Sequence, residues 1–111
     1  MKEITAIELQ NLLKNEEILI VDVRTAEEYA QAHLKNAFLM ELHNFNQEKL
    51  EQKCEGILGL KKVIFQCRSG VRSVSAIELL SSRFPYESYN LQGGIIAWVG
   101  RGYEVILNDG E

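Results

Sequence analysis

Seven consecutive residues of this chain carry the side chains best suited to chemistry. They are Cys67, Arg68, Ser69, Gly70, Val71, Arg72 and Ser73. The cysteine follows an apolar run typical of a strand and precedes a pattern typical of a helix, so it lies where backbone N–H groups are free and the helix dipole is positive. Helix amino ends and neighbouring cations lower a cysteine pKa from about 8.5 to roughly 3.5–7.5. We therefore predict that Cys67 is a nucleophilic thiolate at neutral pH.

The six residues after the cysteine are predicted to bind an anionic substrate. Gly70 tolerates a positive φ, which allows successive backbone N–H groups to turn inward around the sulfur as a nest. Arg68 and Arg72 add guanidinium groups, and Ser69 adds a hydroxyl group. The alternative is that Cys67 is a small buried hydrophobe at a strand end. The two arginines argue against it, because a buried guanidinium group needs an anionic partner.

Two charged residues, Asp22 and Arg24, flank the end of an inner strand. We expect them either to pair with loop arginines or carboxylates and hold the shape of the site, or to form a plain surface ion pair. Arg72 is expected to be partly engaged in structure, through Asp22 or a carboxylate nearby.

The remaining candidates have more ordinary interpretations. Cys54 lies in a predicted helix without a glycine loop, so we expect a packing or surface residue with no role. His33 and His43 are expected to be ordinary polar residues, because a metal site needs clustered ligands at set spacings, and no metal or cofactor is predicted. Gly93–Gly94 is too short for a dinucleotide fingerprint and predicts a simple turn. Trp98 is expected to pack in the core.

Helix signals recur along the chain. Capping boxes at residues 5–8 and 25–28 predict helices that run to about residue 14 and to near residue 33. Asn46 or a neighbour caps a third helix, which stops near Gly56. A fourth helix ends before Pro85, because the residue before a proline avoids helical geometry. Its apolar face consists of Val74, Ile77 and Leu80.

Four short apolar runs predict strands between these helices. They are residues 18–23, 37–40, 62–66 and 89–91. The first has the continuous apolar character of a strand covered on both faces, which is typical of a parallel sheet. Strands that alternate with helices predict an α/β domain with a mainly parallel central sheet and helices on both faces. Cys67 then lies at the carboxyl end of a strand, where such sheets bind ligands.

The size and charge of the chain limit its domain count and its partners. Its 111 residues predict one domain, residues 1–111, large enough to fold without disulfides. A net charge of -4 has the wrong sign for gripping nucleic acid, and no run of about 18 apolar residues supports a membrane span. We expect a cytoplasmic protein with neither nucleic acid nor membrane as a partner, and with one reactive and one inert thiol.

The same residues resemble the motifs of the single-domain rhodaneses, a family of thiosulfate sulfurtransferases. The loop from Cys67 to Ser73 matches the family's C-R-x-G-x-R-S without a mismatch. Two further elements resemble D-V-R-x-x-x-E followed by G-H-I-x-G-A, and L-x-G-G-x-x-A-W. They contain Asp22, Val23, Arg24, Glu28, His33, Leu34 and Ala37, and then Leu91, Gly93, Gly94, Ala97 and Trp98. The resemblance implies a single rhodanese-like domain.

Three residues depart from the family pattern. Ala32 and Asn36 stand where the family usually has glycines, and Met40 lies near where a proline is common. These changes concern the geometry of the turn at residues 32–40 and not the thiol chemistry, since Asn also tolerates left-handed backbone conformations.

The resemblance also implies a double displacement through a persulfide on Cys67. The thiolate attacks the outer sulfur of thiosulfate or a related donor, sulfite leaves, and a second nucleophile removes the bound sulfur. The implied partners are a small-molecule sulfur donor and a cyanide or thiol acceptor, with a small thiol protein among the candidates. No metal or organic cofactor is required.

Two other functions stay open at this point. A cysteine-based phosphatase or arsenate reductase also places a cysteine and an arginine around an anion. Those enzymes have five residues between the two, whereas four separate Cys67 from Arg72, and they need a general acid that the sequence does not place. A non-catalytic rhodanese-like module for binding or regulation is the second alternative. Such domains typically lose the cysteine, which this chain retains.

Overall fold

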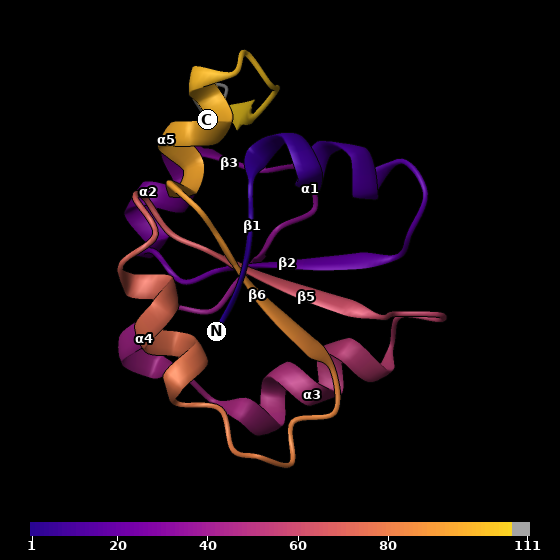
Figure 1. Ribbon diagram of the computed structural model, residues 1–111. Helices are drawn as coiled ribbons and strands as arrows, with labels where there is room; N and C mark the ends of the chain where they lie inside the picture. The colour runs from indigo at the N-terminus through magenta and orange to yellow at the C-terminus, as the bar shows by residue number, and fades with distance from the viewer. Residues whose placement is uncertain (108–111) are drawn as a thin grey trace.

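A parallel sheet between two helical layers forms the frame of the molecule in the computed structural model, which describes residues 1–107 (Figure 1). The sheet order is β1-β6-β5-β2-β4, and every pair is parallel. Its strands are β1 (Lys2–Ile4), β2 (Ile18–Asp22), β4 (Phe38–Leu39), β5 (Lys62–Gln66) and β6 (Glu87–Leu91). The helices are α1 (Ala6–Leu13), α2 (Ala26–Gln31), α3 (Gln47–Glu55), α4 (Arg72–Glu78), α5 (Gly94–Gly100) and a 3-10 turn η1 (Leu42–Asn44). A small antiparallel pair joins β3 (Ala32–His33) to β7 (Ile106–Leu107).

Alternation along the strands gives the sheet two apolar faces. In the central strand β5, Val63 and Phe65 join the core cluster that contains Leu50 of α3 and Ala76 of α4. Ile64, between them, joins the opposite cluster with residues of α1 and α5. Figure 1 shows α1 and α5 on one side of the sheet and α3 and α4 on the other. The predicted α/β fold, with a parallel sheet covered on both faces, is therefore confirmed.

Both predicted capping boxes are present. In the first, the Thr5 hydroxyl accepts from the Glu8 N–H at 3.1 Å, and the Glu8 carboxylate accepts from the Thr5 N–H at 2.9 Å. Thr25 caps α2 in the same way. The second helix, predicted to end near His33, ends two residues earlier at Gln31, because the next two residues are extended and pair with β7.

Two further expectations need correction. β1 has no counterpart among the predicted strands, and it adds to the sheet by pairing with β6 at the edge. The fully buried residues of α4 are Ser73 and Ala76, with Ile77 partly buried beside them, whereas the predicted Val74 lies outside the core cluster. Small side chains at the two buried positions allow the helix to lie close to the sheet.

The turn at residues 32–40 accommodates its departures from the family pattern. Asn36 has a φ of 63°, the left-handed conformation that a glycine would adopt and that Asn tolerates. Ala32 is extended, with a φ of -166°, which any residue can adopt. Met40 is buried, and its N–H donates to the Asp22 carbonyl at 2.8 Å. The substitutions are thus compatible with the turn.

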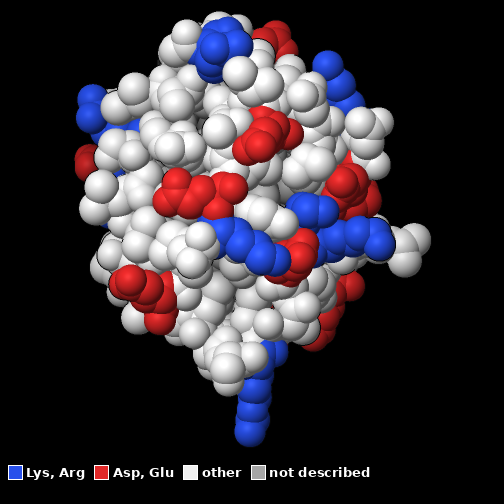
Figure 2. Space-filling model, in the orientation of Figure 1, with Lys and Arg blue, Asp and Glu red and all other residues white. Residues whose placement is uncertain are grey.

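The surface in view is mixed in charge. Figure 2 shows acidic and basic side chains interspersed, without a broad area of one sign on this face. None of the helices within residues 1–107 combines the length and apolar character that crossing a membrane requires.

Candidate active site

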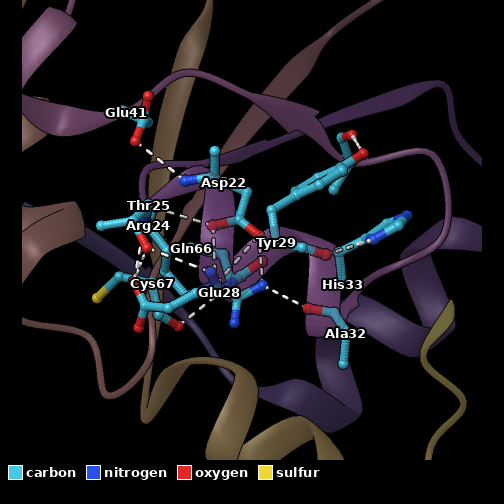
Figure 3. A network of polar contacts seen from close by, with 12 residues as sticks. Asp22, Arg24, Thr25, Glu28, Tyr29, Ala32, His33, Glu41, Gln66 and Cys67 are labelled. Atoms are coloured by element: carbon cyan, nitrogen blue, oxygen red, sulfur yellow. Dashed lines mark hydrogen bonds and ion pairs between the residues drawn. The ribbon is translucent and has the colours of Figure 1, made fainter. Parts of the chain in front are cut away.

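Cys67 lies at the carboxyl end of the central strand, immediately before the loop that leads into α4. Its Sγ accepts a hydrogen bond from the Gly70 N–H at 3.1 Å and lies 3.4 Å from the Ser73 Oγ. Gly70 has a φ of 101°, which turns the chain back toward the cysteine. Figure 3 shows the sulfur pointing away from the side chains of Asp22 and Gln66. The loop therefore brings polar hydrogens to one sulfur atom.

The surroundings of Cys67 lower the pKa of its thiol below the ordinary value. Burial is the largest influence and acts in the opposite direction, because Cys67 is only 1% exposed and a buried thiolate loses its hydration. The Ser73 hydroxyl and the backbone N–H groups of Ser73, Gly70 and Ser69 stabilise the negative charge and together outweigh burial. The site thus stabilises the thiolate, the nucleophilic form of cysteine, relative to an ordinary cysteine.

The start of α5 holds the loop from behind. The N–H groups of Ile95 and Ile96 donate to the carbonyls of Cys67 and Arg68 at 2.9 and 3.2 Å. Gly94 makes this approach possible, because a Cβ there would lie 2.4 Å from the Cys67 carbonyl oxygen. The glycine pair is therefore more than the simple turn that the sequence predicts. The dipeptide alone gives no signal of this role, since the contact joins segments far apart in the chain.

Gln66 adds a further bond to the same peptide. Its Nε2 donates to the Cys67 carbonyl at 2.9 Å, and its side chain is fully buried. The Cys67 carbonyl thus accepts hydrogen bonds from both Gln66 and Ile95, which fix the orientation of this peptide.

Arg72 is tied to α2. Its guanidinium group donates to both carboxylate oxygens of Glu28, at 2.8 and 2.9 Å. These bonds lower the pKa of Glu28 to about 2 and raise that of Arg72 above its ordinary value. Of the two partners expected for Arg72, the structure selects a nearby carboxylate and not Asp22. Because Glu28 also caps its own helix at Thr25, the ion pair links the start of α4 to the start of α2.

Asp22 and Arg24 pair with one another. Three hydrogen bonds join the Arg24 guanidinium group to the Asp22 carboxylate, the shortest at 2.8 Å. Arg24 also donates to the Ala32 carbonyl at 2.7 Å. Arg24 thus pairs with a carboxylate, as expected, but neither residue pairs with a loop arginine (Figure 3). Their side chains are 0% and 6% exposed, so the alternative of a surface ion pair is wrong. The two residues pair because a buried charge requires a partner. Through its bond to Ala32, Arg24 also anchors the turn after β2.

Among residues 1–107, Arg68 is the loop arginine without an ion-pair partner. It is exposed and lines a hollow of about 420 Å³ whose apolar wall comes from α5. The other charges in this hollow are neutralised: Arg24 by Asp22, and Glu28 by Arg72. Within residues 1–107, Arg68 has no carboxylate at ion-pair distance. The hollow therefore complements an anion.

The remaining loop residues and candidates take distinct positions. Ser69 and Val71 are exposed, Val71 at 71%. Burial raises the pKa of Cys54 to about 11, so this thiol stays protonated at neutral pH. His33 stacks on Tyr29 with ring centroids 3.9 Å apart, and His43 lies on the surface. Across residues 1–107, no three His, Cys, Asp or Glu side chains gather as metal ligands would.

The site is a buried cysteine between a parallel strand and a helix, with backbone N–H groups and a hydroxyl group around its sulfur. The chain belongs to the rhodanese-like domain family, whose profile matches residues 5–101. A sulfurtransferase of Allochromatium vinosum is 33% identical over 101 residues, which cover 91% of this chain and 90% of that protein. The thiosulfate sulfurtransferase GlpE of Coxiella burnetii is 33% identical over 97 residues, covering 87% and 86% of the two chains.

A solved structure agrees with this assignment. The rhodanese-related protein of Thermoplasma volcanium superposes with a TM-score of 0.74 at 27% identity, covering 96% of this chain and 99% of that one. Together with the two relatives, it supports a general sulfurtransferase role, in which sulfur passes from a donor to an acceptor.

Proposed function

We propose that this protein transfers sulfane sulfur from thiosulfate or a similar donor to a thiol or cyanide acceptor, through a persulfide on Cys67. The observation that carries the proposal is the hydrogen bond from the Gly70 N–H to the Cys67 Sγ at 3.1 Å, in a loop that favours the thiolate. The same donors suit a persulfide, whose terminal sulfur is also an anion. The matching relatives named as sulfurtransferases support this reading.

The first half-reaction loads the enzyme. The Cys67 thiolate attacks the outer sulfur of thiosulfate, and the bond between the two sulfur atoms of the donor breaks. Sulfite leaves with the electron pair of that bond, and the outer sulfur stays on Cys67 as a persulfide. Arg68, a loop residue that has no ion-pair partner within residues 1–107, attracts the dianionic donor and the leaving sulfite.

The second half-reaction unloads it. An acceptor thiolate or cyanide attacks the terminal sulfur, and the Cys67 thiolate leaves in its original form. Neither half-reaction needs a metal or an organic cofactor. A reducing compartment such as the cytoplasm suits this chemistry, because both cysteines are free thiols.

Intact-protein mass spectrometry tests the proposal. After incubation with thiosulfate, we expect a gain of about 32 Da that cyanide reverses, the mass of one sulfur held as persulfide. Cys54→Ser serves as the matched control and should gain the same mass, whereas Cys67→Ser should not. A protein that stays unmodified contradicts the proposal and leaves a phosphatase or a non-catalytic module as the better reading. A gain that persists in Cys67→Ser contradicts the assignment of the persulfide to Cys67.

A further inference from the structure

A buried asparagine shares one hydroxyl group with the reactive sulfur. Asn90 lies on β6 and is 3% exposed. The Ser73 hydroxyl donates to Asn90 Oδ1, and the same Ser73 oxygen lies 3.4 Å from the Cys67 Sγ. Asn90 Nδ2 donates to the Gly70 carbonyl at 3.4 Å, which orients the amide so that its oxygen faces Ser73.

The Cys67 sulfur and the Asn90 amide oxygen compete for the one hydrogen of the Ser73 hydroxyl, because an amide oxygen only accepts. When that hydrogen points to the sulfur, it gives the thiolate the stabilisation described for the active site. When it points to Asn90, the lone pairs of Ser73 face the sulfur and this stabilisation is lost. A protonated Cys67 thiol then fits the site, because its S–H donates to the Ser73 Oγ. A thiolate in the same place receives a hydrogen bond from Ser73 only if the hydroxyl turns away from Asn90, which leaves a buried amide oxygen unpaired.

We propose that Asn90 is a positioning residue that acts through Ser73 to disfavour the thiolate form of Cys67, and that it thereby sets the fraction of resting protein ready to react. This inference rests on the proposed function, because it assigns Cys67 as the nucleophile. The hydrogen bonds of the Asn90 side chain within residues 1–107 go to Ser73 and Gly70 and not to the sulfur, so its effect passes through the Ser73 hydroxyl. Replacing Asn90 with an apolar residue of similar shape frees that hydroxyl for the sulfur.

Other charges around the loop are not changed by this replacement. They are Arg68 in the loop, Arg72 on α4, Asp22 and Arg24 after β2, Glu28 on α2, and Glu41 and His43 beside Arg72 at η1. None of them is a hydrogen-bond partner of Asn90. Their influence on the sulfur is therefore common to all the variants compared.

A double-mutant cycle on the alkylation of Cys67 tests the inference. The rate of iodoacetamide labelling is followed against pH, and the Cys67 peptide is resolved from the Cys54 peptide by mass spectrometry. Asn90→Leu should lower the apparent pKa of Cys67 by about 0.5–1 unit, the scale of one hydrogen bond. In the Ser73→Ala background, the same substitution should leave the pKa unchanged. Ser75→Ala, an exposed serine of the same helix, is the matched control and should behave as the unmodified protein.

The outcomes separate positioning from simple loss of structure. If loss of the Asn90–Gly70 bond merely loosens the loop, the pKa of Cys67 shifts equally with and without Ser73, and that result overturns the proposal. The absence of a shift in both backgrounds overturns it as well. Circular dichroism verifies the fold, and Asn90→Ala is read in the same way should the leucine not fit. Alkylation requires no sulfur transfer, so the cycle can succeed even if the persulfide of the proposed function is never found.

Discussion

Replacing Gly94 with alanine is expected to damage the active-site loop from behind. The new Cβ would lie 2.4 Å from the Cys67 carbonyl oxygen and 2.5 Å from backbone atoms of Arg68, none of which can rotate away. Gly94 also has a φ of +59°, a conformation that costs alanine about 1–2 kcal/mol. Relieving the contact separates α5 from the loop and weakens the two hydrogen bonds from Ile95 and Ile96, each of about 0.5–1.5 kcal/mol. We expect the free energy of unfolding to fall by about 2–5 kcal/mol.

Gly102→Ala is the matched control for this substitution. Gly102 has a φ of +79°, but nothing lies within 4 Å of the position that an alanine Cβ would take. Gly102→Ala therefore has the conformational cost of about 1–2 kcal/mol without a steric clash. Urea denaturation followed by the fluorescence of the single tryptophan measures both variants. Thiosulfate-to-cyanide transfer, per folded molecule, should fall at least about tenfold in Gly94→Ala and stay normal in Gly102→Ala. Equal losses of stability in the two variants, together with full activity in Gly94→Ala, would refute the role of Gly94 in the contact between α5 and the loop.

Two further substitutions test the charges of the site. Glu28→Gln should lower the free energy of unfolding at pH 7 by about 1–2 kcal/mol, a value discounted for the partial exposure of the ion pair. The pKa of Glu28 is about 2 in the folded protein against an ordinary 4.5. In urea titrations, the difference in stability from the unmodified protein should therefore vanish as pH falls from about 4.5 to 2. A constant difference across that range would contradict the role of the Arg72 pair. Arg68→Gln should raise the KM for thiosulfate about tenfold without changing stability, whereas the exposed control Arg83→Gln should not. An unchanged KM in steady-state assays would show that Arg68 does not attract the donor.

Much of the fold is visible in the sequence because its signals are local. The capping boxes at Thr5 and Thr25 join residues three positions apart, so a single helical turn contains both partners. Strands that alternate with helices indicate a parallel sheet, because two parallel strands can be joined only by a crossover connection, which is usually a helix. The sequence does not predict β1, because a strand of three residues is too short to show a hydrophobic pattern. Its place in the sheet depends on pairing with β6, which is far along the chain.

The positions of the site residues depended on contacts that no local pattern reports. The sequence leaves Arg72 to pair with Asp22 or with a carboxylate nearby. In the fold Asp22 pairs with Arg24, and Arg72 pairs with Glu28. Whether Asp22 is buried or exposed decides this pairing, and burial is a property of the packed molecule. Asn90 likewise reaches Ser73 only because β6 lies beside β5 and under the start of α4.

By itself, the sequence determined the surroundings of the Cys67 sulfur. Cys67, Gly70 and Ser73 are so close in the chain that the N–H and hydroxyl groups meet the sulfur through local backbone geometry alone. Only the tertiary structure decided what holds that loop in place. Gly94 and Glu28 are distant in sequence from the residues they contact, and hydrogen bonds and ion pairs between distant segments form where packing of the two helical layers brings them together.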